Sequence, residues 1–241
     1  MKTTLALLLS GMMFLASCKK EKDLTIDPPA EEIAAVCISQ TGNPTGRSYT
    51  TAEVEAYTCT SSHCGFMPLS RKNYWVYQDS IFNNGVFERV QLDTLRFTQN
   101  WLSKTDGLVW WESNISVGLP EVFYSNDSTI FKMEDRMFTD DMLDVRKEFA
   151  LSAGDSARYI TSFSDNAAIC RSIKMSSTLQ TPAGNFSDLV YFDKNAPYFR
   201  RDQVFFKPGV GVVKYIQEKA VMGNPSIKLQ QVSTLVGYHL E

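Results

Sequence analysis

The chain has 241 residues, a formal net charge of −3, 44% hydrophobic residues and 12% aromatic residues. This length suits one sizeable domain or a domain with an appendage. The mild acidic balance, without basic blocks, argues against nucleic acid as a partner. The hydrophobic and aromatic content excludes a disordered stalk and predicts a well-filled core.

The chain begins with a basic residue, Lys2, followed by a short apolar run from Leu5 to Leu15 and by small residues before Cys18. This order is the layout of a secretory signal. A transmembrane helix needs about 20 apolar residues, and this run is shorter. The segment Leu15-Ala16-Ser17-Cys18 resembles the lipobox of bacterial lipoproteins.

That resemblance implies cleavage before Cys18, a diacylglycerol thioether on its sulfur and acylation of the new amine, for example by palmitate. More than one acyl chain gives stable anchoring, since each buried CH₂ contributes about 0.8 kcal/mol. In this family an Asp after the lipidated cysteine resembles an inner-membrane retention signal, and Lys19 departs from it. We therefore expect a signal peptide at 1–17, a lipidated tether at 18–29, and an outer-membrane protein on the periplasmic or cell-surface side.

Residues 30–66 read as a small cysteine-bearing appendage with short helices. Asp27-Pro28 favours a helix start that runs to about Cys37. Thr50 and Glu53 have the spacing of a capping box, which predicts a second short helix towards Thr58.

Lipidation of Cys18 leaves Cys37, Cys59, Cys64 and Cys170. In an oxidising compartment we expect two disulfides, with three possible connectivities. In 169–179 the apolar residues alternate with polar ones, so Cys170 projects from the polar face. An outward Cys170 is placed to pair with Cys64, or with another of the three, and to pin the appendage on the sheet.

A zinc set of Cys37, Cys59, His63 and Cys64, or a reactive thiol, is the alternative. No paired C-x-x-C element supports it, so we expect no metal, and His63 reads as an exposed loop residue.

Residues 67–241 show short β-rich runs separated by turn signals, with no long helical pattern between them. The turns are Asn83-Asn84-Gly85, Asp106-Gly107, Thr181–Gly184, Pro208-Gly209 and Gly223–Pro225. This texture predicts a mainly β, antiparallel domain, with a curved sheet that is barrel-like or a sandwich.

Strand 108–117 places Trp111 on its core face and Trp110 on the opposite, outward face. Strands 73–82 and 186–192 carry large apolar residues on both faces, so each is covered on both sides, by a second sheet, the appendage or a ligand. Trp110 is therefore our candidate for stacking on a ligand, with a partly covered aromatic as the plain alternative.

No catalytic constellation is evident. The two histidines are His63 and His239, and neither G-x-S-x-G, H-E-x-x-H nor a Walker-type loop occurs. The acidic run from Glu134 to Asp144 reads as a solvated loop. We expect no catalytic residues and no cofactor.

The pieces TPAGNF (181–186), KPGVGVVKY (207–215) and NYWVY (73–77) resemble motifs of exported β-rich bacterial lipoproteins. The resemblance implies a fold and a location in the cell envelope, but it implies no catalytic residue. We expect a membrane-anchored envelope lipoprotein that binds a small apolar or sugar ligand without catalysis, with Trp110 at the mouth of the site. The alternatives are an accessory subunit that docks an envelope protein partner and, less favoured, an enzyme.

Overall fold

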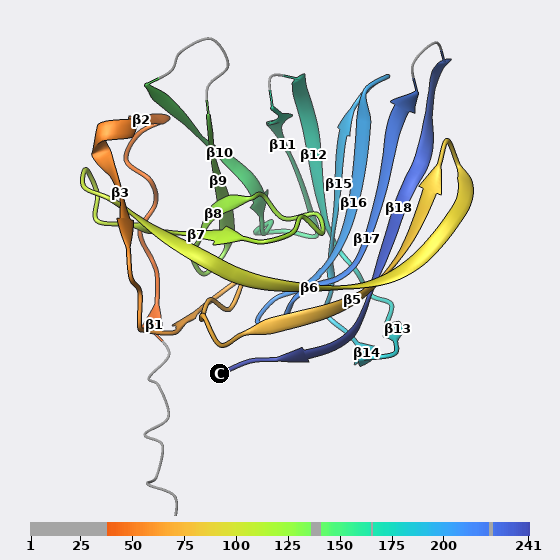
Figure 1. Cartoon of the computed structure of the whole chain (residues 1–241), viewed down its shortest axis with the longest axis horizontal. Coiled ribbons are helices and arrows are strands. Elements are labelled where there is room, and N and C mark those ends of the chain that lie inside the picture. Colours follow the sequence, from red (N-terminus) through yellow and green to blue (C-terminus); the bar gives the residue numbers. More distant parts are fainter. Residues whose placement is uncertain (1–37, 136–140, 165, 222–223) are drawn as a thin grey trace, which may run out of the picture. The chain divides into compact units, whose positions relative to one another are not determined.

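A computed structural model describes residues 38–135, 141–164, 166–221 and 224–241. Residues 34–241 belong to one compact unit, built almost entirely of strands (Figure 1). The elements are β1 (Ile38–Ser39), β2 (Ser48–Thr50), the 3₁₀ turn η1 (Thr51–Glu53), β3 (Val54–Tyr57), β4 (His63–Cys64), β5 (Tyr74–Asn83), β6 (Val86–Ser103), β7 (Val109–Ser113), β8 (Val122–Ser125), β9 (Thr129–Asp135), β10 (Met142–Ala150), β11 (Ser156–Phe163), β12 (Asn166–Lys174), β13 (Leu179–Thr181), β14 (Gly184–Phe186), β15 (Val190–Ala196), β16 (Arg200–Lys207), β17 (Gly211–Val221) and β18 (Asn224–His239).

One antiparallel sheet of 14 strands contains most of these elements, in the order β11-β12-β15-β16-β17-β18-β5-β6-β7-β8-β9-β10-β2, with β3 also paired to β6. The predicted mainly β, antiparallel class is confirmed. Two small pairs, β1 with β4 and β13 with β14, lie outside this sheet. Within the described part of the chain, no helix is long and apolar enough to cross a membrane.

The turn chemistry explains where the strands end. Asn84 and Gly85 join β5 to β6 with φ values of 54° and 85°, a conformation that asparagine and glycine tolerate. Gly107 follows β6 at φ 71°, and Gly184 closes the β13–β14 hairpin at φ 136°. These turns lie where the sequence predicts them.

The capping box at Thr50 and Glu53 is present, because the Thr50 backbone N–H donates to Glu53 Oε2 at 2.6 Å. It opens only the 3₁₀ turn η1, so the predicted helix towards Thr58 is wrong. From Val54 onward the chain pairs with β6 as β3, and β2 pairs with β10. The expected helix over 28–37, the tether and Cys18 lie outside the described residues.

The sheet curves until β10 and β11 approach each other, without closing into a barrel. Among the described strands, β11 pairs with β12 alone. Tyr159 Oη nevertheless accepts from the Ala150 N–H at 2.9 Å and donates to the Glu148 carbonyl at 3.1 Å. We call this line, where side chains take the place of a backbone ladder, the seam.

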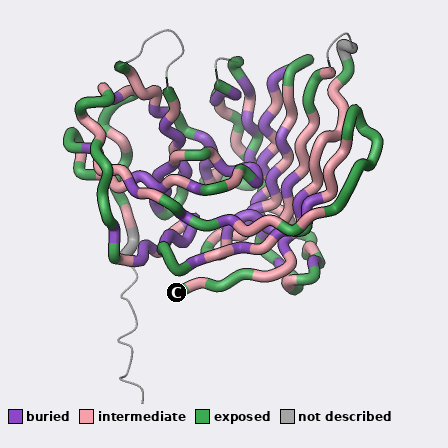
Figure 2. The backbone as a smooth tube through the Cα atoms, viewed as in Figure 1, coloured by how far each residue is buried: buried purple, intermediate pink, exposed green. Residues whose placement is uncertain are grey.

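The core occupies the inside of the curve. Figure 2 shows buried positions alternating along β15 and β16, as expected for strands with one face on a core. Trp75 and Tyr77 are fully buried, and their polar atoms donate to the carbonyls of Val210 and Val212 at 2.7 and 2.8 Å. A second, smaller cluster is built around Tyr49, Trp110 and Tyr124.

Candidate functional site: a polar cavity across the seam

A cavity of about 630 Å³ lies over the seam. Strands β6, β7, β9 and β10 line it from one side, and β11, β15 and β16 line it from the other. Its volume falls within the range of about 300–1,000 Å³ that is usual for small-molecule sites. Buried ion pairs and aromatic rings together form its walls.

The innermost pair joins Lys194 of β15 to Glu148 of β10. Lys194 Nζ lies 2.5 Å from Glu148 Oε1, and both residues are 4% exposed. Thr161 of β11 donates to the second carboxylate oxygen at 3.0 Å. Both oxygens of Glu148 are therefore occupied, each by a residue from the opposite side of the seam.

A second pair lies on β9. Lys132, 3% exposed, donates to Glu134 Oε1 at 2.5 Å and to the Ser162 carbonyl across the seam at 2.9 Å. Burial lowers the pKa of Lys132, and the neighbouring Lys194 lowers it further, while Glu148 and Glu134 oppose the shift. Glu134 is thus part of the cavity wall, which corrects its assignment to a solvated loop.

The third pair is on β16, where Arg200 donates to both oxygens of Asp202 at 2.8 and 2.7 Å. Arg200 also donates to Tyr215 Oη at 3.1 Å. Burial raises the pKa of Asp202, and the guanidinium opposes that shift. A planar bidentate pair of this kind holds both groups in one orientation.

Aromatic rings complete the cavity. Trp101 Nε1 donates to Glu112 Oε2 at 2.9 Å, which fixes the indole beside a carboxylate. Lys194 Nζ lies 4.1 Å and Arg200 Cζ lies 4.8 Å from the ring centroid of Phe163. The ring of Phe199 packs against Phe163 with a centroid separation of 6.3 Å. The site therefore offers ring faces next to hydrogen-bonding groups.

Gly118 lets the loop before β8 reach this wall. It has φ 82°, and a Cβ there would lie 2.8 Å from both Tyr215 and Val204. Only glycine fits such a close approach in that conformation.

The predicted outward position of Trp110 is wrong. Its side chain is fully buried, packed edge-on to Tyr49 at 5.9 Å and beside Tyr124 at 5.9 Å. β7 is covered on both faces, because the second core cluster fills the side that the alternation left open. Trp111 is buried in the main core, as predicted.

The expected disulfide of Cys170 is also wrong. Cys170 is fully buried on the inner face of β12 and carries a free thiol, whose pKa burial raises to about 12. The predicted faces of this strand are reversed: Ile173 is 40% exposed, whereas Ser172 is 1% exposed. Cys170, on this inner face, belongs to the main hydrophobic core.

The other cysteines divide into two groups. Cys59 is buried with a free thiol, contrary to its assignment to a disulfide, and its sulfur lies 3.4 Å from His63 Nε2. His63 is buried in β4, so its predicted exposure is wrong. Cys64 is disulfide-bonded, and Cys37 lies outside the described residues. Across the described ranges, no group of three or more His, Cys, Asp or Glu residues is placed to hold a metal.

Sequence reasoning missed the three ion pairs because charged residues on strands are normally assigned to the solvent face. One signal was available: Lys194 is in phase with Val190, Phe192 and Ala196, and Asp202 is in phase with Val204 and Phe206. A charged residue in an apolar register predicts a buried charge, which needs a partner.

Chemically, the cavity presents alternating donors and acceptors beside exposed ring faces. Such a lining suits a ligand rich in hydroxyl groups, since each hydroxyl both donates and accepts. The innermost carboxylates, Glu148 and Asp202, already accept bonds at both oxygens. Comparisons with protein-family models, with curated proteins and with solved structures found no match.

Proposed function

We propose that this protein is a lipid-anchored lipoprotein of the bacterial cell envelope that binds a small, sugar-like ligand without catalysis. The observation that carries the binding role is the cavity of about 630 Å³ with Trp101 and Glu112 at its wall. The proposed location rests on the lipobox at Cys18 and on Lys19 after it, which favour the outer membrane.

The Trp101–Glu112 pair supports a sugar in preference to a purely apolar ligand. The carboxylate orients the indole through Oε2, and its second oxygen is an acceptor for a ligand hydroxyl. Tryptophan offers a flat apolar face with low conformational entropy, which suits stacking on a sugar ring. A fully apolar ligand would leave the second oxygen of Glu112 without a partner.

The ion pairing of Glu148 and Asp202, the two buried carboxylates among the described residues that line the cavity, supports binding over hydrolysis. A glycosidase mechanism needs one carboxylic acid and one carboxylate free to act on the sugar. Here the buried carboxylates of Glu148 and Asp202 are held in ion pairs. Their role in this proposal is to fix the wall of the cavity.

A glycan microarray tests the proposal, with the mature chain carrying Cys18→Ser so that it is free of lipid. We expect at least one sugar to bind, and Trp101→Ala and Glu112→Gln to weaken it by about tenfold or more, as for a buried aromatic or charged contact. Tyr57→Ala is the matched control, because Tyr57 is a 39% exposed aromatic that does not line the cavity. Binding of no sugar, or equal losses in Trp101→Ala and Tyr57→Ala, would overturn the proposal.

A further inference from the structure

The charges on the wall of the cavity do not cancel. Three basic side chains line it, and each is held in one of the ion pairs described above. Six acidic side chains line it, of which three lie outside those pairs: Glu112, Glu121 and Asp135. Among the described residues, no Lys or Arg side chain forms an ion pair with any of these three. The lining therefore has a formal charge of −3, which favours a positively charged ligand and disfavours an anionic one.

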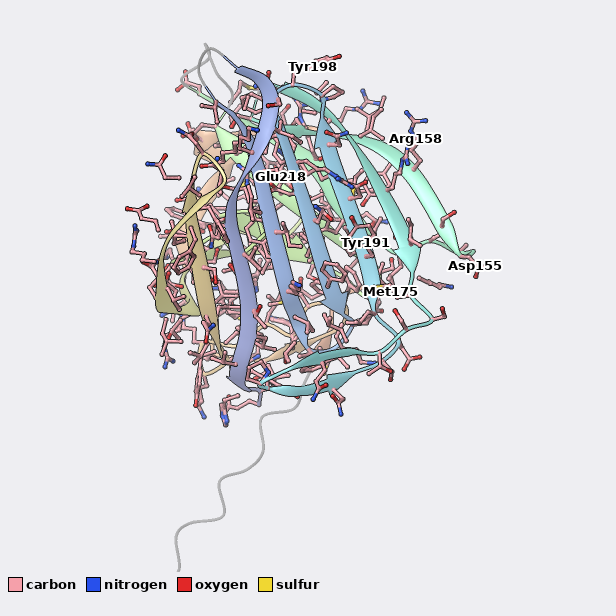
Figure 3. All side chains as sticks on the ribbon, turned by 90° about the vertical axis from the view of Figure 1, so that its right-hand side faces the viewer. Asp155, Arg158, Met175, Tyr191, Tyr198 and Glu218 are labelled. Atoms are coloured by element: carbon pink, nitrogen blue, oxygen red, sulfur yellow. The ribbon has the colours of Figure 1, made fainter. Side chains whose placement is uncertain are left out.

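On the outer face of β15, β16 and β17, in contrast, carboxylates are paired with a cation. Arg201 of β16 donates to both oxygens of Asp193 on β15 at 2.7 and 3.2 Å, and its guanidinium lies 3.7 Å from Glu218 Oε2 on β17. Figure 3 looks onto this face, where Glu218 is labelled. These carboxylates thus have a cationic partner on a neighbouring strand, which the three carboxylates of the cavity lack among the described residues.

Two of the unpaired carboxylates share a face of the sheet with an aromatic ring. Trp101 Nε1 donates to Glu112 Oε2 at 2.9 Å. Glu112 lies opposite Val122, and Val122 lies opposite Met133, so these three side chains share one face. Asp135 follows Met133 by two residues on β9 and therefore projects from the same face. This part of the wall thus combines an indole and two carboxylates with apolar side chains.

A carboxylate held beside an indole is suited to an ammonium group. The Trp101 N–H is used by Glu112, so the indole contributes its ring face, and a cation is attracted to that face. The second oxygen of Glu112 can accept a charge-assisted hydrogen bond from an ammonium, which is stronger than a bond from a neutral hydroxyl. Within the described ranges, no three His, Cys, Asp or Glu residues are placed to hold a metal ion, so an organic cation fits this wall better than a metal.

We propose that the ligand is an amino sugar, whose ammonium group lies against the Trp101 ring and Glu112 while its hydroxyl groups contact the polar side chains of the cavity. This inference rests on the proposed sugar-binding function and adds the charge of the ligand. Glu121 and Asp135 increase the negative potential that draws the cation into the cavity. Uronic acids and sulfated or phosphorylated sugars are disfavoured by the same potential.

Calorimetric titration of the lipid-free mature chain at pH 6.5 tests this with matched methyl glycosides. The probes are the glycosides of glucosamine, galactosamine and mannosamine, their N-acetyl forms, and the parent glucoside, galactoside and mannoside, so that charge and ring configuration vary separately. We expect at least one amino glycoside to bind about tenfold or more tightly than both of its neutral forms, because hydrogen bonds between charged groups are the stronger ones. Added salt is expected to reduce that preference, since screening weakens the attraction.

Two variants locate the ammonium group. Glu112→Gln removes the charge but keeps an acceptor for the Trp101 N–H, and it is expected to reduce the preference for the amino glycoside by about tenfold. Asp135→Asn is expected to reduce the preference by about twofold or more. Because Asp135 is exposed, this second variant does not depend on core packing. Glu88→Gln is the matched control, since the side chain of Glu88 on β6 is 52% exposed and does not line the cavity.

The outcomes separate this inference from the proposed function. Equal affinities of the amino and neutral glycosides, no binding of any amino glycoside, or equal losses of preference in Glu112→Gln and Glu88→Gln would each overturn the amino-sugar inference. A neutral sugar bound on the microarray would then leave the sugar-binding proposal standing. If the microarray finds no sugar and no glycoside binds in the titration, both proposals are wrong.

Discussion

Trp101 and Trp110 lie directly opposite each other on β6 and β7, and their environments differ. Opposite residues of an antiparallel pair share one face of the sheet. On this shared face Trp101 lines the cavity and packs against the second core cluster, whereas Trp110 is fully buried within that cluster.

Replacing Trp110 by alanine is expected to lower the free energy of unfolding by about 3–5 kcal/mol, because it leaves a large cavity in a packed cluster. Trp101→Ala is expected to have a smaller effect, since that side chain is only partly buried. Urea unfolding curves of the two variants measure the difference. An unchanged midpoint for Trp110→Ala would contradict its place in the core.

Asp79 is a second residue whose surroundings give a measurable effect. It is 2% exposed, and burial raises its pKa to about 6, with a further contribution from Asp93; hydrogen bonds from Ser233 and Gln231 oppose the shift. The folded state thus binds a proton between about pH 4 and 6 that the unfolded state has released. Stability from this group is greatest near pH 4 and is lost as the pH rises through 6.

Asp79→Asn is therefore expected to stabilise the protein at pH 7.5, by on the order of 1–2 kcal/mol, and to have little effect near pH 4. The amide keeps an acceptor for Gln231, which now donates to Asp79 Oδ2 at 3.1 Å. Melting temperatures across pH 4–8 test this. A variant that is less stable at pH 7.5 would show that the aspartate charge contributes favourably.

At the scale of elements, the seam joins β10 to β11 through side chains. Glu148 of β10 is central, because both of its carboxylate oxygens bind residues across the seam, Lys194 of β15 and Thr161 of β11. Buried pairs contribute little net stability over apolar replacements, but removing one partner leaves an uncompensated buried charge.

Glu148→Ala is accordingly expected to lower the free energy of unfolding by about 3–5 kcal/mol, since it leaves the Lys194 ammonium buried without its partner. Glu55→Ala serves for comparison: its partner Lys104 is 50% exposed in the side chain, and such surface pairs contribute about 0–1 kcal/mol. Chemical denaturation of both variants provides the measurement. Similar losses in the two would mean that the buried pair does not hold the seam.

Turns and strands were predictable from sequence because their determinants are local. Asn84-Gly85 and Asp106-Gly107 specify their turns through φ alone. Which face of β12 is buried could not be predicted from the sequence, because alternation gives a period but does not say which side lies inside. Cys170 and Ser172 lie on the buried face because distant strands cover it, and the candidate site likewise depends on long-range contacts, of Glu148 with Lys194 and of Lys132 with the Ser162 carbonyl.

At the scale of the whole molecule, the state of the cysteines bears on the proposed lipidation of Cys18. Cys59 and Cys170 carry buried free thiols, and Cys64 is disulfide-bonded. If Cys18 is lipidated as proposed, Cys37 is the remaining partner for Cys64. The exported protein is then expected to contain one disulfide in place of the two inferred from sequence.

Non-reducing peptide mapping of the full protein extracted from the envelope tests this. We expect a Cys37–Cys64 cross-linked peptide, an acylated N-terminal peptide at Cys18, and alkylation of Cys59 and Cys170 only after unfolding, because buried thiols react slowly. Cys18→Ser is expected to leave the protein unanchored. A Cys18–Cys64 cross-link would contradict lipidation.

The seam has a consequence for the size of the cavity. In a closed barrel, strand number and shear fix the girth, so the interior has a set diameter. The sheet described here is interrupted between β10 and β11, and the interruption lies in the wall of the cavity. Its circumference is therefore set at the seam by side-chain contacts, those of Glu148 and Tyr159 among them, and not by a continuous backbone ladder.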